Sequence, residues 1–482
     1  MILTLAFRHL AVRRVRALVL LVGFSLGVGV MIVLLSVGEA MLEQSRDVAL
    51  VGGGEITVLP QGIDVEAMRT GGLSGMFFGI DRARFVTRQL LGGARERGIV
   101  RTVAPAIESK LLYLSHAGRT VPVRVGGEIP SRAAAVGASL RIVAGRWVDA
   151  PEDSQYIAPT RQQLYDDIDH FHLPARPDSA WAEWHYFNVV LSPVEWWYVT
   201  YLVGGEIGHG RWGGQLLITH RRADGRYERF DGAAAPDQIV LDTLRADLTL
   251  GGSAVQQRDG VYHLTARAGG PAGPVRIDLQ VRPQPNRYFP PVTLASDAFL
   301  SGYVAPGLVA EASGTVCVAA RCRRIDAAPA YHDHNWGVWR EVTWEWGAAR
   351  GERLAVLYGG VYQPALDASA APFFLTAIDS LGVRQVLRFH RIDYAGARPV
   401  PGAPGVVAPE RFDLVAGREG DTLRLSVHID DVHATAMGAA AFRRYFLQMR
   451  GRFTVTGRFG TAAVADSGAG FFETYVRGRP AP

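Results

Sequence analysis

The most regular pattern in the chain is a two-residue alternation of apolar and polar side chains, which recurs from about residue 180 to the end. Tyr262, Leu264 and Ala266 alternate with polar or charged neighbours directly after an Asp259-Gly260 turn signal, and residues 275–281 and 423–430 repeat the pattern. Short alternating runs separated by Gly, Pro and Asp-Gly are typical of antiparallel strands. About three hundred residues is long for one barrel, so we expect two barrel-like lobes, residues 179–328 and 329–482.

The N-terminal part follows a different pattern. Residues 17–38 carry no charge and consist mainly of Leu, Val, Ile and Gly, a length that suffices to cross a bilayer, which needs about 20 residues. Arginines precede this stretch and acidic residues follow it, which predicts a cytoplasmic N-terminus for an anchor in residues 1–40. A cleavable signal peptide is the alternative, but its apolar core is usually only about 7–15 residues long. We therefore expect a retained inner-membrane anchor, with the bulk of the chain outside the cytoplasm.

Residues 41–152 are predicted to form a small α/β domain, with a strand at 55–60, a helix at 82–91 and a strand at 121–125. Residues 153–178 resemble a polar linker. A cluster of His and Asp at 164–172 invites a metal interpretation, although most such clusters are solvated linkers.

Three short segments within the first 150 residues resemble the start of a MacB/FtsX-type ABC-transporter permease. They are Leu5-Ala6-Phe7-Arg8-His9-Leu10 before the apolar span, residues 54–60, and residues 143–149. The resemblance implies a first membrane helix followed by part of a periplasmic core domain. Such permeases continue to three further membrane helices, which this sequence lacks, so we expect an anchor or docking module beside ABC-transporter subunits.

Charge and cysteine content exclude two classes of function. The net charge of +5 owes four charges to arginines that precede the first acidic residue, and Lys110 is the only lysine. No basic cluster interleaved with aromatics suggests a nucleic-acid surface. Cys317 and Cys322 are too few for a structural zinc site. They lie on either side of a predicted tight turn, where a disulfide and two free thiols are equally compatible with the sequence.

The densest chemistry lies in Tyr331-His332-Asp333-His334-Asn335-Trp336-Gly337, which is followed by Trp344 and Trp346. In an extended strand, Tyr331, Asp333 and Asn335 share one face, and the two histidines share the other with Trp336. A carboxyl group among indoles is poorly solvated, which raises its pKa. Asp333 is therefore predicted to hold a transferable proton; the alternative is an acid bonded to backbone or arginine. The two histidines could ligate a metal, but no third ligand is evident, so we predict no metal and no cofactor.

A second aromatic motif, Glu195-Trp196-Trp197-Tyr198, precedes the first by more than a hundred residues. Its rings could fill a barrel interior or form the wall of an apolar pocket. Glu195 is interpreted as a structural acid or, alternatively, as a buried acid that acts in the site.

Together with Gly470-Phe471-Phe472-Glu473, these motifs resemble the AttH/carotenoid 1,2-hydratase (hydroxyneurosporene synthase) family over about residues 155–482. The resemblance implies two lipocalin-like domains around an apolar ligand. It also implies that Asp333 protonates an isolated alkene and that Tyr331 supports the cation. The residues assigned to the predicted site are as follows: catalytic Asp333, Tyr331 and His334; ligand-binding Glu195, Trp196, Trp197, Tyr198, Asn335, Trp336, Trp344 and Trp346.

Two functions remain open from the sequence. One is hydration of an isoprenoid alkene, with water positioned by His334, Asn335 or Tyr331. The other is a membrane-tethered carrier that holds a lipid or other apolar molecule without chemistry and passes it to or from an ABC transporter.

Overall fold

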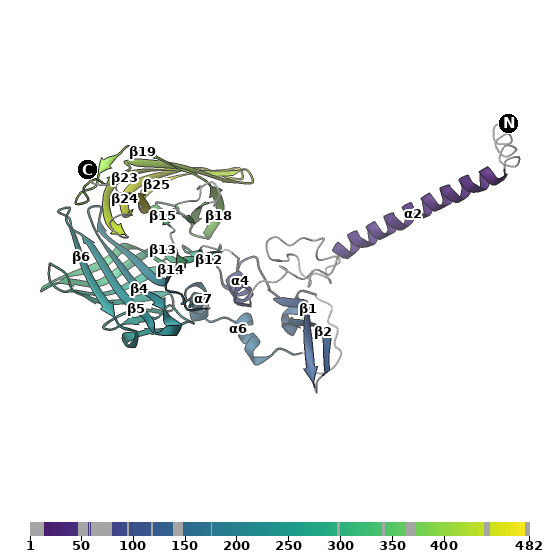
Figure 1. Cartoon of the computed structure of the whole chain (residues 1–482), viewed down its shortest axis with the longest axis horizontal. Coiled ribbons are helices and arrows are strands. Elements are labelled where there is room, and N and C mark those ends of the chain that lie inside the picture. The colour runs from purple at the N-terminus through teal and green to yellow at the C-terminus, as the bar shows by residue number, and fades with distance from the viewer. Residues whose placement is uncertain are drawn as a thin grey trace. The chain divides into compact units, whose positions relative to one another are not determined.

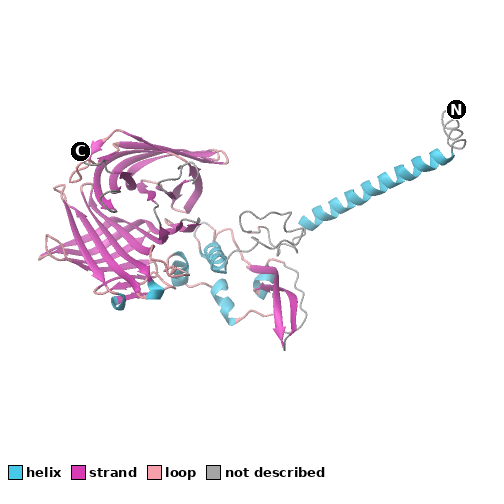
Figure 2. Ribbon diagram, in the orientation of Figure 1, coloured by secondary structure: helices cyan, strands magenta, loops and turns pink. Residues whose placement is uncertain are grey.

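The chain folds into two compact units, one of residues 1–91 with 100–158 and one of residues 92–99 with 159–482. A computed structural model gives the structure, which describes residues 14–46, 56, 58, 80–93, 96–116, 119–137, 148–174, 176–295, 299–339, 343–362, 373–437 and 444–477. The first unit is mainly helical with a two-stranded sheet, and the second is almost entirely strand (Figures 1 and 2).

The N-terminal unit contains the predicted helix and one of the predicted strands. Its elements are α2 (Arg14–Arg46), α4 (Ile80–Gly92), β1 (Ala106–His116), β2 (Arg119–Glu128), α5 (Pro130–Ala135), η2 (Pro151–Asp153) and α6 (Ser154–Ile157). The helix predicted at 82–91 is α4, and the strand predicted at 121–125 lies in β2, which pairs with β1. The strand predicted at 55–60 and the permease-like segment at 143–149 fall mostly outside the described residues.

The predicted membrane anchor coincides with α2, which is 33 residues long. Within the described part of the chain, no helix is long and apolar enough to cross a membrane. The prediction of a membrane-spanning anchor is therefore not confirmed.

The second unit begins with α7 (Arg161–Ile168), within the segment that the sequence presented as a linker. Thr160 caps this helix: its hydroxyl accepts a hydrogen bond from the backbone N–H of Gln163, and the Gln163 side chain accepts from the Thr160 N–H. The helix ends where Asp169 adopts an extended conformation. This end places the Asp169 side chain in the interior, where it is 1% exposed.

The first lobe is a 12-stranded antiparallel sheet in the order β6-β5-β4-β3-β14-β13-β11-β10-β9-β8-β7, with β12 paired to β13. An isolated bridge between Asp231 and Gly269 joins distant parts of the sheet, which curls into a barrel-like shape (Figure 1). The bounds are β3 (Trp181–Ser192), β4 (Glu195–Glu206), η3 (Ile207–His209), β5 (Arg211–Arg221), β6 (Tyr227–Ala234), η4 (Pro236–Gln238), β7 (Ile239–Leu241), β8 (Leu248–Leu250), β9 (Ser253–Arg258), β10 (Val261–Ala268), β11 (Val275–Pro283), β12 (Phe289–Ala295), β13 (Phe299–Val318) and β14 (Arg321–Trp339).

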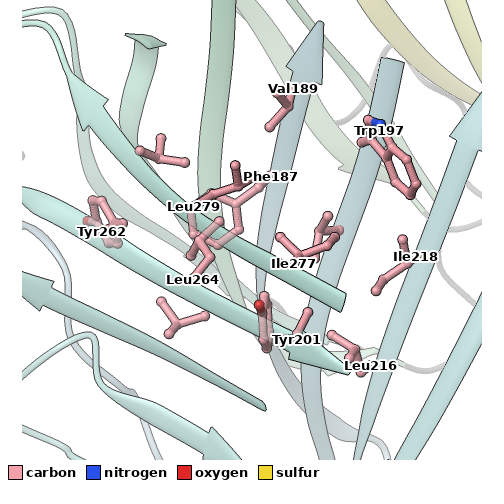
Figure 3. Close-up of a cluster of buried hydrophobic side chains, with 14 of the residues drawn as sticks. Phe187, Val189, Trp197, Tyr201, Leu216, Ile218, Tyr262, Leu264, Ile277 and Leu279 are labelled. Carbon is pink, nitrogen blue, oxygen red and sulfur yellow. The ribbon is translucent and has the colours of Figure 1, made fainter. Parts of the chain in front are cut away.

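The alternation in the sequence accounts for the interior of this lobe. Tyr262, Leu264 and Ala266 of β10 are at most 1% exposed, as are the apolar positions of β11, whereas the intervening polar residues point outward. Figure 3 shows these side chains meeting Phe187 and Tyr201 from β3 and β4. Each such buried side chain contributes about 1.5–3 kcal/mol of transfer free energy. The predicted Asp259-Gly260 turn has both residues at positive φ, 48° and 83°, as a tight hairpin requires.

The second lobe is a nine-stranded antiparallel sheet in the order β18-β17-β16-β15-β25-β24-β23-β22-β19, and a further pairing of β18 with β22 closes it into a barrel-like shape. The bounds are β15 (Thr343–Gly351), β16 (Ala355–Tyr362), β17 (Phe373–Asp379), β18 (Gly382–Phe389), β19 (Ile392–Ala395), β22 (Arg411–Arg418), β23 (Asp421–Met437), β24 (Arg444–Phe459) and β25 (Ala462–Arg477). Strands β20 (Arg398–Pro399) and β21 (Val407–Ala408) pair as a separate two-stranded sheet. The mainly β fold with two barrel-like lobes is confirmed. The first sheet runs through Trp339, so the Tyr331–Gly337 motif lies in the first lobe and not beyond a boundary at residue 328.

The two lobes pack against each other through a third apolar cluster. It draws on Tyr186, Tyr198 and Tyr331 from the first sheet and on Trp346 and Phe471 from the second, among others. Gln448 Nε2 of β24 also donates a 3.1 Å hydrogen bond to the Tyr186 hydroxyl, across the lobes.

The two cysteines form a disulfide that links β13 to β14 across their hairpin turn. The adjacent pair Val318–Arg321 leaves two residues for the turn, and one of them, Ala319, has a positive φ of 51°. Of the two alternatives that the sequence left open, the structure contains the disulfide.

Candidate functional site

Strand β14 separates two buried clusters of polar side chains. It is hydrogen-bonded on one side to β13 and on the other to β3, so its side chains point alternately to the two faces of the sheet. Tyr331, Asp333 and Asn335 lie on the face that meets the second lobe, whereas His332 and His334 lie on the opposite face. The predicted division of this motif between two faces is confirmed.

Asp333 lies within a chain of hydrogen bonds that crosses between the lobes. The Tyr331 hydroxyl donates to Asp333 Oδ2 at 2.6 Å, and Asn335 Nδ2 donates to Oδ1 at 2.7 Å. Trp346 Nε1, from the second lobe, donates to the Tyr331 hydroxyl at 3.0 Å. Because an indole N–H can only donate, the Tyr331 oxygen accepts from it and directs its own proton to Asp333.

The environment of Asp333 favours its protonated form. Its side chain is 3% exposed, and burial raises its pKa to about 7, against the opposing effect of the hydrogen bonds from Tyr331 and Asn335. The structure thus places Asp333 neither in open solvent nor against a guanidinium group among the described residues. A carboxylic acid with a pKa near neutrality can act as a general acid.

A second buried carboxyl group, Glu473 of β25, lies close enough to Asp333 for the two to interact. Burial raises the pKa of Glu473 to about 8, and the charge of Asp333 adds to this effect. Trp344 Nε1 donates to Glu473 Oε2 at 3.3 Å. Asp333 belongs to the first lobe and Glu473 to the second. Since burial raises the pKa of both, the interface between the lobes contains two carboxyl groups that hold protons near neutral pH.

On the opposite face of β14, histidines and carboxylates form a cluster inside the first lobe. His334 Nδ1 lies 2.5 Å from Asp169 Oδ1, and His334 Nε2 lies 3.0 Å from Glu183 Oε1. His332 Nε2 approaches Asp169 Oδ2 at 3.4 Å, and the His185 ring packs against the His334 ring with centroids 4.0 Å apart. All five side chains are at most 1% exposed.

Contacts within this cluster determine which of its side chains are charged. Burial alone would lower the pKa of His334, but the Asp169 and Glu183 carboxylates outweigh it and raise that pKa to about 9. Burial alone would raise the pKa of Asp169, but the charge of His334 and the hydrogen bonds from His332 and His334 hold it well below its usual value. Burial and the charge of His334 keep the pKa of His185 well below 6.5, so this ring is neutral.

The three aromatic residues of the Glu195–Tyr198 motif lie in two places. Trp196 and Tyr198 belong to the apolar cluster between the lobes, and the guanidinium groups of Arg221 and Arg450 lie 5.0 and 5.2 Å from the Trp196 ring centroid. Trp197 points into the first lobe and stacks on His220 at 3.8 Å. The barrel-interior interpretation therefore applies to Trp197, whereas Trp196 and Tyr198 lie in the apolar cluster between the lobes.

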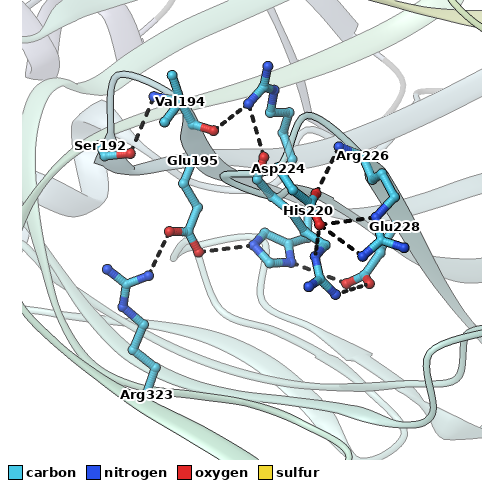
Figure 4. Close-up of polar contacts among 10 residues, drawn as sticks. Ser192, Val194, Glu195, His220, Asp224, Arg226, Glu228 and Arg323 are labelled. Atoms are coloured by element: carbon cyan, nitrogen blue, oxygen red, sulfur yellow. Dashed lines mark hydrogen bonds and ion pairs between the residues drawn. The ribbon is translucent and has the colours of Figure 1, made fainter.

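Glu195 takes part in an ion-pair network, as Figure 4 shows. Its carboxylate contacts Arg323 Nη1 at 2.7 Å and His220 Nε2 at 3.3 Å, and its side chain is 17% exposed. His220 in turn reaches Glu228 at 3.4 Å. This arrangement corresponds to the structural interpretation of Glu195 and not to a buried proton donor.

The two lobes also line a hollow of about 390 Å³. Tyr227 and Thr219 come from the first sheet, and His433 and Thr435 come from the second. The Tyr227 hydroxyl donates to Asp431 at 2.9 Å.

The structure brings together part of the predicted site. Asp333, Tyr331, Asn335, Trp344, Trp346, Trp196 and Tyr198 lie at the interface of the lobes or hydrogen-bond to its acids. The other four predicted residues lie elsewhere. Trp336 stacks on His172 at 3.6 Å on the far side of the sheet, together with His334; Trp197 and Glu195 are placed as described above.

Sequence reasoning missed the second acid, Glu473, and the partners of the histidines. Glu473 follows two phenylalanines in an alternating strand, and this position among apolar residues was the available signal. Asp169, Glu183 and His185 meet His334 only through the pairing of β14 with β3 and the end of α7, which the sequence does not reveal.

No family model matches the chain, and no curated protein matches it. Among solved structures, it is similar to a candidate AttH protein from Nitrosomonas europaea, with 13% identity and a TM-score of 0.44 over 61% of this chain and 93% of that one. Kievitone hydratase from Nectria haematococca gives 14% identity and a TM-score of 0.41 over 63% of this chain and 93% of that one. CghA gives 10% identity and a TM-score of 0.44 over 64% and 94%. Nothing in these comparisons supports the permease resemblance of the N-terminal part.

Proposed function

We propose that the C-terminal unit binds an apolar, alkene-containing molecule between its lobes and that Asp333 protonates it. The observation that carries this proposal is a carboxyl group that is 3% exposed, has a pKa raised to about 7 by burial and is surrounded by aromatic rings from both lobes. An acid with this pKa still holds its proton in about half of the molecules at pH 7 and can therefore donate it near neutral pH.

Two hydrogen bonds hold the Asp333 carboxyl group in place. Oδ2 accepts from the Tyr331 hydroxyl and Oδ1 accepts from Asn335 Nδ2. In the proposed reaction, the alkene takes the proton of the Asp333 carboxyl group and becomes a tertiary carbocation. Water then adds to the cation, and the proton that the added water loses returns to Asp333, directly or through Glu473.

The aromatic rings would stabilise the positive charge that forms in this reaction. A carbocation is stabilised by the faces of indole and phenol rings, by up to about 2 kcal/mol for each ring when water is excluded. Tyr331 and Trp346 are joined by a hydrogen bond beside Asp333, so both lie close to the acid. The proposed class of substrate is accordingly an isoprenoid or another molecule with an isolated, substituted alkene.

We propose that the ligand enters through the hollow beside Tyr227. The Tyr186 and Tyr198 ring centroids lie 5.9 Å apart. Charge interactions contribute to the raised pKa values of these phenols: Tyr198 acts on Tyr227, Glu473 acts on Tyr198, and Glu473 and Asp333 act on Tyr186. These phenols therefore form a series of neighbours between the hollow and the two acids.

Incubation of the purified full-length chain with isoprenoid alkenes in H₂¹⁸O, followed by mass spectrometry, tests the proposal. The expected product gains one molecule of labelled water, and Asp333→Asn abolishes its formation while binding persists. The matched control is Asp326→Asn, an exposed acid on the same strand that pairs with Arg324. Turnover by the Asp333→Asn variant would show that another group donates the proton.

The second candidate function is a carrier without chemistry. It is favoured by the hydrogen bonds that both oxygens of Asp333 already make, which suit a structural acid. Recovery of an unchanged apolar ligand from native protein, with no hydrated product in the same assay, would favour this function. An inner-membrane location and association with ABC-transporter subunits remain predictions from the sequence.

A further inference from the structure

The cluster on the opposite face of β14 combines three potential metal ligands. Asp169, His185 and His334 each offer one ligand atom, and these atoms all lie within 4.8 Å of one another. The side chains come from three separate segments: the residue after α7, β3 and β14. All three are at most 1% exposed, so they face one another and not solvent.

The hydrogen bonding of the cluster is incomplete. Neither ring nitrogen of His185 makes a hydrogen bond of ordinary geometry among the described residues, although the Ala246 backbone lies near enough to favour the charged form of the ring, and Glu183 Oε2 also lacks a partner. A buried polar atom left in this state costs about 1–3 kcal/mol, and native proteins rarely retain several together. The unpartnered His185 nitrogens, on a ring packed against that of His334, indicate that a ligand completes this site.

We propose that this cluster binds a divalent transition-metal ion through Asp169 Oδ1, His334 Nδ1 and one ring nitrogen of His185. The first two atoms are hydrogen-bonded at 2.5 Å in the structure, so the ion would replace the proton between them, and that proton would be released to solvent. The proposal is independent of the alkene chemistry, since the cluster lies on the other face of the strand.

The remaining contacts match those that support metal ligands in proteins. Ligating histidines usually present their second nitrogen to a carboxylate, and His334 Nε2 lies 3.0 Å from Glu183 Oε1. A ligating carboxylate is usually hydrogen-bonded in turn, and Asp169 Oδ2 accepts from the Tyr262 hydroxyl and faces His332 Nε2 at 3.4 Å. Asp169 Oδ1 has His334 Nδ1 as its partner in the structure, and both atoms would turn to the ion.

Charge and donor type restrict the ion. Two buried carboxylates, Asp169 and Glu183, require positive charge nearby, which protonated His334 provides in the metal-free chain and a divalent ion would provide after displacing that proton. Imidazole nitrogen and carboxylate oxygen suit zinc and the neighbouring divalent metals. Ligand atoms around zinc lie about 3.3 Å apart, so Asp169 Oδ1 and His334 Nδ1 would separate from 2.5 Å to accommodate the ion. Bound there, the ion would tie the segment after α7 to strands β3 and β14.

Metal analysis of the full-length protein tests the inference. Chelator-treated protein is incubated with Zn²⁺ and desalted, and its zinc content and melting temperature are measured. We expect about one zinc ion per chain and a melting temperature that rises with zinc concentration.

His185→Leu is the decisive variant because a metal-free cluster and a metal site predict different results for it. If the cluster holds no metal, this change removes two unpartnered buried nitrogens and leaves the melting temperature equal or higher. If His185 is a ligand, zinc content falls to that of the blank and the zinc-dependent rise disappears. His332→Gln, which alters only a supporting contact, should fold and weaken zinc binding about 10–100-fold.

His428→Gln is the matched control, since this histidine is exposed on the other lobe. It should bind zinc as the unmodified protein does. A zinc-free protein after incubation, or a zinc content unchanged by His185→Leu, would overturn the proposal and leave a metal-free polar cluster.

Discussion

Replacement of Asp333 by Asn is expected to change how stability depends on pH. The folded protein raises the pKa of this carboxyl group from 3.8 to about 7, chiefly by burial. Asn has nearly the same shape and cannot ionise, and its oxygen still accepts from Tyr331 while its NH₂ group donates to the Asn335 side chain once that amide has turned over. The difference in the free energy of unfolding between the unmodified protein and the variant therefore reports the cost of an ionised Asp333 in the interface.

The magnitude follows from the linkage between proton binding and folding. Because the folded pKa lies above the unfolded one, the stability that protonated Asp333 contributes is fully present below about pH 4 and is lost as the pH rises through about 7. At 1.36 kcal/mol per pH unit, the loss amounts to about 4 kcal/mol at most. Asp333→Asn avoids this loss, so the variant should gain stability relative to the unmodified protein progressively from about pH 4 to about pH 7 and keep that gain at higher pH.

Urea unfolding followed by tryptophan fluorescence at several pH values measures this difference, because Trp344 and Trp346 lie in the same interface. Asp326→Asn, whose carboxylate is largely exposed, serves as the control and should leave the slope unchanged. Parallel stability curves for the unmodified protein and Asp333→Asn would refute the reasoning, since they would mean that Asp333 ionises equally easily in the folded and unfolded chains.

Three further perturbations have expected outcomes. Tyr331→Phe removes a hydrogen bond that lowers the pKa of Asp333, so the alkaline loss of stability should move to higher pH in the same urea titrations. Gly302→Ala would place a Cβ about 2.0 Å from the buried Trp336 ring and should cost about 1–3 kcal/mol in the free energy of unfolding, whereas Gly252→Ala meets only a side-chain carbon at 3.7 Å and should cost less than this. Reduction of the hairpin disulfide opens a short loop and should lower the free energy of unfolding by about 2 kcal/mol, measurable with and without reductant; an unchanged midpoint would contradict this.

The fold was largely accessible from the sequence because strand alternation is a local signal. The alternating segments at 262–267 and 275–281 became β10 and β11, and the turn between strands appeared at Asp259-Gly260. Local alternation could not predict how many strands the first sheet contains or where it ends. Strand β14 is 19 residues long and pairs with β3 far away in sequence, and no local pattern states which sheet a strand joins.

The candidate site was predictable to the extent that it depends on a single strand. The two-residue alternation of a strand placed Asp333 and His334 on opposite faces, and the number of Trp residues nearby predicted a raised pKa for Asp333. The partners of each residue come from other strands: Glu473 from β25 and Asp169 from the end of α7. Their approach depends on sheet order and lobe packing, so the apparent lack of a third metal ligand was a consequence of reading one segment alone.

Infrared difference spectroscopy of the carboxyl group tests most directly whether Asp333 carries a proton near neutral pH. Spectra of the unmodified protein minus those of Asp333→Asn, recorded across a pH titration, isolate the C=O band of this protonated acid. The account predicts a band that is present at mildly acidic pH and disappears with a midpoint of about 7. A residue already ionised at about pH 5, with no such band, would contradict the account.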